Sequence, residues 1–408
     1  MSSTPPAPSE SKGPSAALLT LFAVVFVNMA GFGLIVPMLP FFARSLNAEP
    51  WEITLMFSAF SLGQFFAEPL WGRLSDRIGR KPVLLATISA NVVGYLLLAF
   101  SPNIWFAIII RLLTGFGAGN ISTIQGYVAD VTPPAQRAGR MGLLGAAFGF
   151  GFIVGPGIGG LLVREEMGRI GFQLPIFVAS ALCLIAALGV FFLVTESREK
   201  AAPGAPRPAF LSGLKDAQAN PVISRVLLVT LIYTAGFAGM ESTFALWAEH
   251  RFGWHAREVG LSFMVIGIVS TLTQGLLAAR LVRRFGEPKL MVFGVSAFGL
   301  SLLLQVLNPI AALTPVIMAL GGFGMSLTMP NISAIISRST PPNQQGAMLG
   351  LNMASGSLAR ITGPIVAGAL FSGLGPNIPM LVGAGLCAMA AWAAFNAGVV
   401  YRRTHPRT

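Results

Sequence analysis

Gly72-Arg73-Leu74-Ser75-Asp76-Arg77-Ile78-Gly79-Arg80-Lys81-Pro82 is a short, strongly charged stretch between two apolar segments, residues 51–71 and 83–100. A weaker copy, Ala279 to Gly286, also lies between apolar segments. A stretch this short cannot form a domain, so we interpret it as a charged loop that joins two membrane-crossing helices. Because the loop occurs twice, it predicts a membrane protein built from two related halves, as in many secondary transporters.

Composition supports a membrane protein. The chain has 408 residues, of which 54% are hydrophobic and only 10% charged, with a mean hydropathy of +0.72. Soluble domains carry about 25% charged residues, so a large soluble protein is excluded. The net charge of +12 does not indicate a nucleic-acid partner, because the basic residues follow the positive-inside pattern of membrane proteins.

Twelve apolar segments are long enough to cross a bilayer, for which about 20 residues suffice. We therefore predict an all-α polytopic membrane protein with twelve transmembrane helices in two pseudo-symmetric six-helix bundles. The predicted spans are 15–43, 52–72, 82–101, 104–129, 138–163, 172–195, 222–248, 258–280, 288–307, 310–337, 344–371 and 377–400.

The Lys and Arg residues predict the orientation. If both termini are cytoplasmic, most of the 27 basic residues lie on inner segments, as the positive-inside rule requires. Arg111 and Arg360 fall within predicted spans. The basic residues on outer segments are Arg44, Arg164, Arg169, Arg251 and Arg257.

The two halves match in order along the chain. Thr132-Pro133-Pro134 corresponds to Thr340-Pro341-Pro342, and Gly155-Pro156 corresponds to Gly363-Pro364. We predict bundles over residues 15–195 and 221–400. Between and around them we predict a disordered cytoplasmic N-terminus (1–14), a polar cytoplasmic linker (196–220) and a cytoplasmic tail (401–408). Cys183 and Cys387 lie in apolar runs and are predicted to be packing residues.

Two motifs carry a family resemblance. Gly72 to Lys81 fits the pattern G-x-L-a-D-r-x-G-r-k, and the fifth span meets G-x8-G-x3-G-P-x2-G-G at every fixed position. The chain thus resembles the major facilitator superfamily, specifically the twelve-helix drug:proton antiporters that include tetracycline efflux pumps. The second motif implies antiport, although its small residues also suit close helix packing. Its residues here are Gly142, Gly151, Gly155, Pro156, Gly159 and Gly160.

The resemblance implies that the charged stretch is a gate. In the family the aspartate, here Asp76, caps the start of the eleventh helix, and the arginines, here Arg77 and Arg80, reach an acid at the end of the fourth, here Asp130. Gly72 and Gly79 would permit the tight reversal. The alternative is that the basic residues only determine topology.

Proton coupling is predicted for three ionisable residues at membrane depth, where such residues are functional candidates by default. Arg111 matches an arginine that assists proton transfer in the family; a purely structural pairing is the alternative. Glu241 is our first choice for the proton-carrying acid, with a gate residue near the outer mouth as its alternative. Glu68 is a further candidate, or else a partner that braces the loop. Tetracycline pumps place an aspartate in the first helix where this chain has Asn28.

Inward polar side chains predict the substrate cavity, and plain bundle packing is the alternative for each. Aromatic and methionine residues such as Phe32, Phe237, Phe244 and Met325 would supply an adaptable apolar wall. The predicted polar lining residues are Asn28, Gln64, Asn120, Gln125, Tyr233, Gln274, Asn331, Asn352 and Arg360.

These features predict a secondary active transporter that exports drugs or other small amphipathic molecules in exchange for protons, by alternating access. A proton-linked importer or facilitator of sugars or organic acids, or a lipid exporter, are alternatives on the same fold. An enzyme is not expected, because no predicted span contains a histidine, and no ATP-binding G-x-x-x-x-G-K-[ST] loop is present. We expect no cofactor or metal, and a monomer in the cytoplasmic (inner) membrane.

Overall fold

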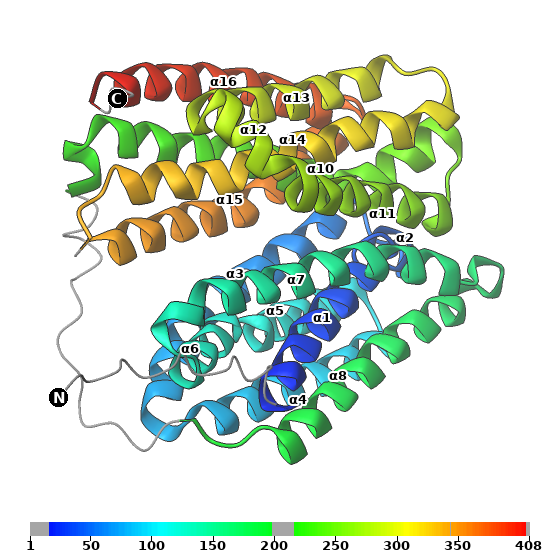
Figure 1. Cartoon of the computed structure of the whole chain (residues 1–408). Helices are drawn as coiled ribbons and strands as arrows, with labels where there is room; N and C mark the ends of the chain where they lie inside the picture. The colour runs from blue at the N-terminus through cyan, green and yellow to red at the C-terminus, as the bar shows by residue number, and fades with distance from the viewer. Residues whose placement is uncertain (1–15, 198–215, 343, 405–408) are drawn as a thin grey trace.

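The computed structural model describes residues 16–197, 216–342 and 344–404. The predicted N-terminal segment 1–14 lies outside these residues, as do most of the predicted linker and the end of the tail. Every regular element that the described residues form is a helix, and the helices gather in two bundles (Figure 1). The prediction of an all-α protein with two helical bundles is therefore confirmed.

The N-terminal bundle contains eight α-helices and one 3-10 segment, which follow the order of the six predicted spans. Its elements are α1 (Ala16–Ile35), α2 (Leu39–Arg44), α3 (Pro50–Ile78), α4 (Arg80–Ala99), α5 (Ile104–Ala118), α6 (Ile121–Val131), α7 (Pro134–Leu162), η1 (Glu165–Phe172) and α8 (Gln173–Leu193).

The C-terminal bundle repeats this plan. Its elements are α10 (Pro221–Phe252), α11 (Ala256–Leu272), η2 (Thr273–Leu277), α12 (Ala278–Phe285), α13 (Glu287–Leu307), η3 (Ala311–Leu313), α14 (Thr314–Arg338), α15 (Gln345–Leu374) and α16 (Ile378–Thr404). Asn220 caps α10, since its side chain accepts hydrogen bonds from the backbone N–H groups of Val222 and Ile223.

Eleven helical spans among the described residues are long and apolar enough to cross a membrane. The second predicted span corresponds to α3, a helix of 29 residues. It is long enough to cross, but Gln64 and Glu68 make its middle more polar than the other spans. This polarity matters for function, because α3 contacts α15 of the opposite bundle.

The charged stretch is not a loop, and this prediction was wrong. α3 continues to Ile78 and α4 begins at Arg80, so Gly79 alone separates them. Gly79 has φ 105°, a conformation that L-residues with a Cβ rarely adopt. Gly286 holds the same place in the second copy, with φ 79°. Gly72 lies inside α3, where an added Cβ would come 3.3 Å from the Ser122 hydroxyl.

Two predicted spans are broken. The first divides into α1 and α2, with Pro37 in the break; proline lacks the N–H that a continuous helix would need. The fourth divides into α5 and α6 at Gly119 and Asn120. By contrast, α7 runs as one helix across Pro156.

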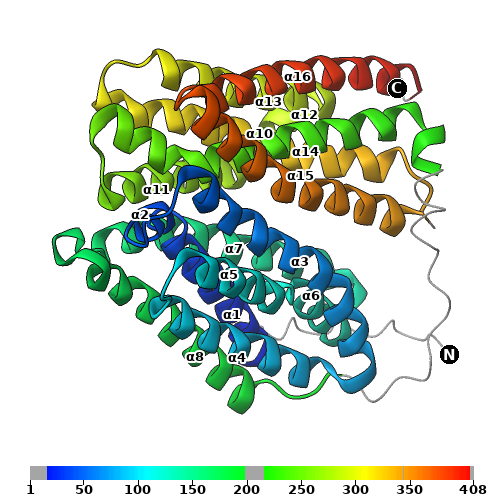
Figure 2. The same cartoon turned by 180° about the vertical axis from the view of Figure 1, so that it is seen from behind.

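The two bundles meet at one end of the molecule. Figures 1 and 2 show the start of α1 and the end of α16 toward the opposite end; we call it the terminal end and the other the far end. The bundles pack through α7 against α11 and α3 against α15. Gly160 lies against the backbone of Ala256, and Gly260 lies against the carbonyl of Pro156. Small residues therefore allow close contact of the bundles at the far end.

Toward the terminal end, the faces of α7 and α11 that pack together at the far end lie apart from each other. Gly149 of α7 is still near the hydroxyl of Thr271, but Gly145 and Gly142, one and two turns earlier, have nothing within 4 Å of an added Cβ. Gly275 and Gly350 are equally open. A space of about 350 Å³ borders this part of α7. The structure is thus closed at the far end and open at the terminal end.

Gly115→Leu should destabilise the N-terminal bundle strongly. An added Cβ at Gly115 of α5 would collide with the carbonyl oxygen of Phe60 in α3, and backbone cannot move aside as a flexible side chain can. Overpacking of this kind costs about 3 kcal/mol or more. The melting temperature in detergent measures it. Gly385→Leu, on an open surface of α16, should melt like the wild type.

Candidate functional site

Glu241 is the buried acid of α10, with 6% of its surface exposed. Its Oε2 atom lies 3.7 Å from Nη1 of Arg360 on α15. Its Oε1 atom is buried and has no hydrogen-bond partner among the described residues. The Arg360 side chain is 44% exposed and lies 5.7 Å from the centre of the Phe237 ring. The pair is loose, so one carboxylate oxygen remains available for a proton or a donor.

Arg111 of α5 is fully buried in the opposite bundle. Within the part of the chain that the structure describes, none of its three guanidinium nitrogens has a hydrogen-bond partner. The guanidinium lies over the ring of Phe60, 4.3 Å from its centre, and it interacts electrostatically with Glu241 across the bundle interface. A cation–π contact offsets only about 2 kcal/mol, which is small beside the cost of an unpaired charge in an apolar interior.

Glu68 faces the same region from α3. Its Oε1 atom accepts a hydrogen bond of 3.2 Å from Gln64, and the charge of Arg360 acts on it from the other bundle. Arg360 therefore lies within electrostatic reach of one acid from each half. The three predicted coupling residues share this charge cluster, and Arg360, which we had assigned only to the cavity lining, connects two of them.

Arg80 is the centre of the charges at the terminal end. Its guanidinium pairs with Asp76 at 2.9 Å and with Asp130 at 3.2 Å, and it donates a 2.6 Å hydrogen bond to the Ser75 hydroxyl. Arg77 is exposed. In this open state Asp76 and Asp130 are thus bridged within the N-terminal bundle.

Glu196 joins these charges and was not predicted as a site residue. Its carboxylate accepts hydrogen bonds from the backbone N–H groups of Arg80 (2.8 Å) and Lys81 (3.1 Å), so it caps the N-terminus of α4. A helix N-terminus favours such a negative charge. The only signal in the sequence is an acidic residue directly after the sixth apolar run.

The predicted cavity residues divide into several groups. Asn120 donates to the Thr87 hydroxyl at 3.0 Å, and Asn352 accepts from the Thr230 hydroxyl at 2.6 Å. Asn331 donates to the backbone of Leu327. These three amides are bonded within their own bundles. Gln125 and Gln274 are exposed, Asn28 and Gln64 are half-buried, and Tyr233 is buried against Phe298.

The fifth-helix motif lies at helix contacts, with one exception. Gly151, Gly155 and Gly159 meet the backbone of α1, whereas Gly160 and Pro156 meet α11. A Cβ added at Gly142 would have no neighbouring element of the described chain within 4 Å.

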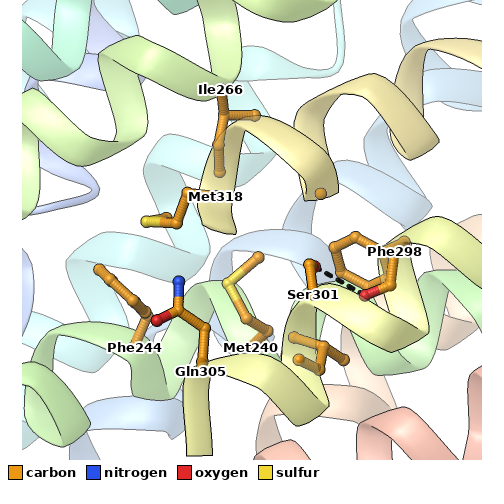
Figure 3. A pocket seen from close by; sticks show the side chains of 9 residues that line it. Met240, Phe244, Ile266, Phe298, Ser301, Gln305 and Met318 are labelled. Carbon is orange, nitrogen blue, oxygen red and sulfur yellow. Dashed lines mark hydrogen bonds between the residues drawn. The ribbon is translucent and has the colours of Figure 1, made fainter. Parts of the chain in front are cut away.

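A small cavity lies inside the C-terminal bundle, between α10, α11, α13 and α14 (Figure 3). Met240, Phe244, Phe298 and Met318 line it, together with Gln305. Its free space of about 20 Å³ is room for one water molecule and not for a drug-sized solute. Phe244, which we predicted in the wall of the central cavity, lines this interior space instead.

Asp76→Asn should cripple transport while expression stays near normal. The carboxamide cannot form the ion pair with Arg80, but the contacts of Arg80 to Asp130 and Ser75 keep the N-terminal bundle intact. Transport activity per folded molecule in membrane vesicles measures the effect. Normal transport by this variant would rule out a gating role for the charged stretch.

The comparisons with known proteins agree with this architecture. The sequence profile described as Major Facilitator Superfamily matches residues 21–286 and 250–408. The tetracycline resistance protein, class C, of Escherichia coli is 30% identical over 364 residues, which cover 87% of this chain and 90% of that protein. Multidrug resistance protein 2 of Bacillus subtilis (strain 168) is 28% identical over 386 residues, covering 90% and 93%.

Solved structures share the fold. The nucleoside transporter NupG superimposes with a TM-score of 0.79 at 16% identity, over 93% of this chain and 99% of that one. A bacterial homologue of the human lysosomal transporter Spinster, in an inward-facing and unoccupied conformation, gives a TM-score of 0.74 at 15% identity, over 96% and 99%. The superfamily consists of transporters of small molecules, so the expectation that the chain is not an enzyme is confirmed. This multi-pass membrane protein belongs to the Major Facilitator Superfamily.

Proposed function

We propose that this protein exports drugs or other small amphipathic molecules across the cytoplasmic (inner) membrane in exchange for protons. Both termini are cytoplasmic and the transporter works as a monomer in the bilayer. Relatives named for tetracycline and multidrug resistance match nearly the whole chain, and the fifth-helix motif is complete. With this orientation the terminal end faces the cytoplasm, so the structure is open to the inside.

The proposed coupling mechanism rests on one observation, the surroundings of Glu241. Glu241 is buried where the bundles meet, one of its oxygens has no hydrogen-bond partner in residues 16–197, 216–342 and 344–404, and its arginine partner Arg360 is 3.7 Å away. A proton on Glu241 removes the attraction to Arg360 and Arg111. Since both arginines interact with this one carboxylate, protonation changes the charge balance across the interface. A proton shifts the balance between two conformations only if it binds one of them more tightly than the other.

Inverted membrane vesicles test this function. The vesicles are acidified inside and loaded with a pH-sensitive dye, and lipophilic cations, tetracyclines, quinolones and sugars are added in turn. Substrate-induced proton release, absent from vesicles without the protein, is the expected result and identifies the substrate class. If no compound moves protons although the protein is folded and binds one of them, the antiport proposal is wrong.

A further inference from the structure

At the far end, a carboxylate of the N-terminal bundle contacts the C-terminal bundle. The residues that form this contact belong to none of the predicted motifs. Glu165 belongs to η1, which follows α7 in the N-terminal bundle. Its Oε1 atom accepts a 2.8 Å hydrogen bond from the backbone N–H of Ala256, and its Oε2 atom lies 2.6 Å from Nδ1 of His255. Both of these residues are at the start of α11 in the C-terminal bundle.

The backbone N–H of Ala256, at the N-terminus of α11, needs a hydrogen-bond acceptor from outside the helix. The first N–H groups of a helix have no acceptor within the helix. The capping box between His255 and Glu258 serves the groups at these two residues, but not that of Ala256, the first helical residue. Glu165 supplies the missing acceptor from the other bundle, and its negative charge suits the positive end of the helix dipole.

The hydrogen bond to the helix N-terminus carries more of the interaction than the contact with His255 does. The His255 side chain is 69% exposed, and exposed ion pairs contribute little because water screens them. Ala256, in contrast, is fully buried. A second ion pair between the bundles, Arg44 with Glu249 at 2.9 Å, is also partly exposed and adds correspondingly little.

We propose that Glu165 is a latch that holds the far end closed by capping α11 of the opposite bundle. Close packing of Gly160 on Ala256 and of Gly260 on Pro156 brings the helix within its reach. When the far end opens, the Glu165 carboxylate and the Ala256 N–H must separate, and each then forms hydrogen bonds with water instead. The latch therefore stabilises the state that is open at the terminal end. It acts on the conformational balance and takes no part in binding substrate or protons.

Distances between spin labels test the latch. One pair, Phe100→Cys with Leu307→Cys, reports on the far end, and another, Phe192→Cys with Phe285→Cys, reports on the terminal end. All four positions are exposed, and the two native cysteines, which are buried, are replaced by alanine. In the full chain in nanodiscs, opening of the far end lengthens the first distance, and alternating access shortens the second at the same time.

Glu165→Ala should raise the ratio of far-end-open to far-end-closed molecules about tenfold, as expected for loss of a hydrogen bond to a charged group. The control Glu166→Ala, at an exposed neighbour, should leave both distance distributions unchanged. Glu165→Gln keeps an oxygen that accepts from the Ala256 N–H, so it should stay much closer to the wild type.

Three outcomes would overturn the latch. One is unchanged distances in Glu165→Ala. Another is a longer far-end distance without a shorter terminal-end distance, which would mean general loosening of the interface. The third is a Glu165→Gln variant as open as Glu165→Ala, which would assign the stabilisation to the contact with His255 instead of the Ala256 N–H. These measurements need no substrate, so they are independent of the proposed antiport.

Discussion

Glu241→Gln should abolish substrate-driven proton release while the protein stays folded and still binds substrate. The carboxamide has nearly the same shape as the carboxylic acid but cannot take up or release a proton. It also loses the ion pair with Arg360, although that pair is long, at 3.7 Å, so little stability is lost with it. Proton release in the inverted vesicles should fall to the level of vesicles without the protein.

Glu287→Gln is the matched control for this substitution. Glu287 is also a largely buried acid paired with an arginine, since Arg338 lies 2.9 Å away, but it lies at the start of α13, toward the terminal end. This variant should retain substrate-driven proton release. If Glu241→Gln retained it as well, Glu241 would lose the coupling role, and Glu68 and Asp130 would become the acids to test.

Gly142→Leu should abolish transport without reducing stability. In the state that the structure shows, a Cβ added at Gly142 has no atom of the described residues within 4 Å. Gly142 lies two helical turns from Gly149, on the face of α7 that packs against α11. Alternating access requires this part of the face to close in the other state, where a leucine would be forced against the opposite bundle. The variant should therefore be held open at the terminal end.

Two measurements separate this effect from misfolding. The melting temperature of Gly142→Leu in detergent should equal that of the wild type, and the terminal-end spin-label distance should remain long when substrate is added. Gly385→Leu, equally unobstructed but on α16, should transport normally. Normal transport by Gly142→Leu would mean that α7 and α11 do not close on each other at the terminal end.

The spans were predictable because hydropathy depends on local composition alone. A run of about 20 apolar residues has few alternatives to a spanning helix, and the fifth-span motif lies within the single helix α7. The charged stretch shows the limit of this reasoning. Charge density indicates that a segment is outside the membrane, but not that it is a loop: α3 stays helical to Ile78, and the reversal depends on Gly79 alone.

The site could be predicted only in part. Glu241, Glu68 and Arg111 stand out in the sequence as candidates because charges at membrane depth are rare and costly. Their partners were not, since Phe60 and Arg360 reach them from other helices, and an ordinary phenylalanine in an apolar run has no distinguishing signal. Some polar residues that we predicted in the cavity lining, such as Asn120, instead form hydrogen bonds inside their own bundle.

The sequence by itself determined the membrane-crossing helices, the two-fold repeat and the family, because each depends on composition or on spacing along the chain. Only the tertiary structure decided which end is open, that Arg360 connects acids of both halves, and that Glu165 caps α11. These contacts join residues far apart in the sequence, 119 positions in the case of Glu241 and Arg360 and 91 in the case of Glu165 and Ala256. They depend on how two separately folded bundles pack, and no local pattern of residues encodes that geometry.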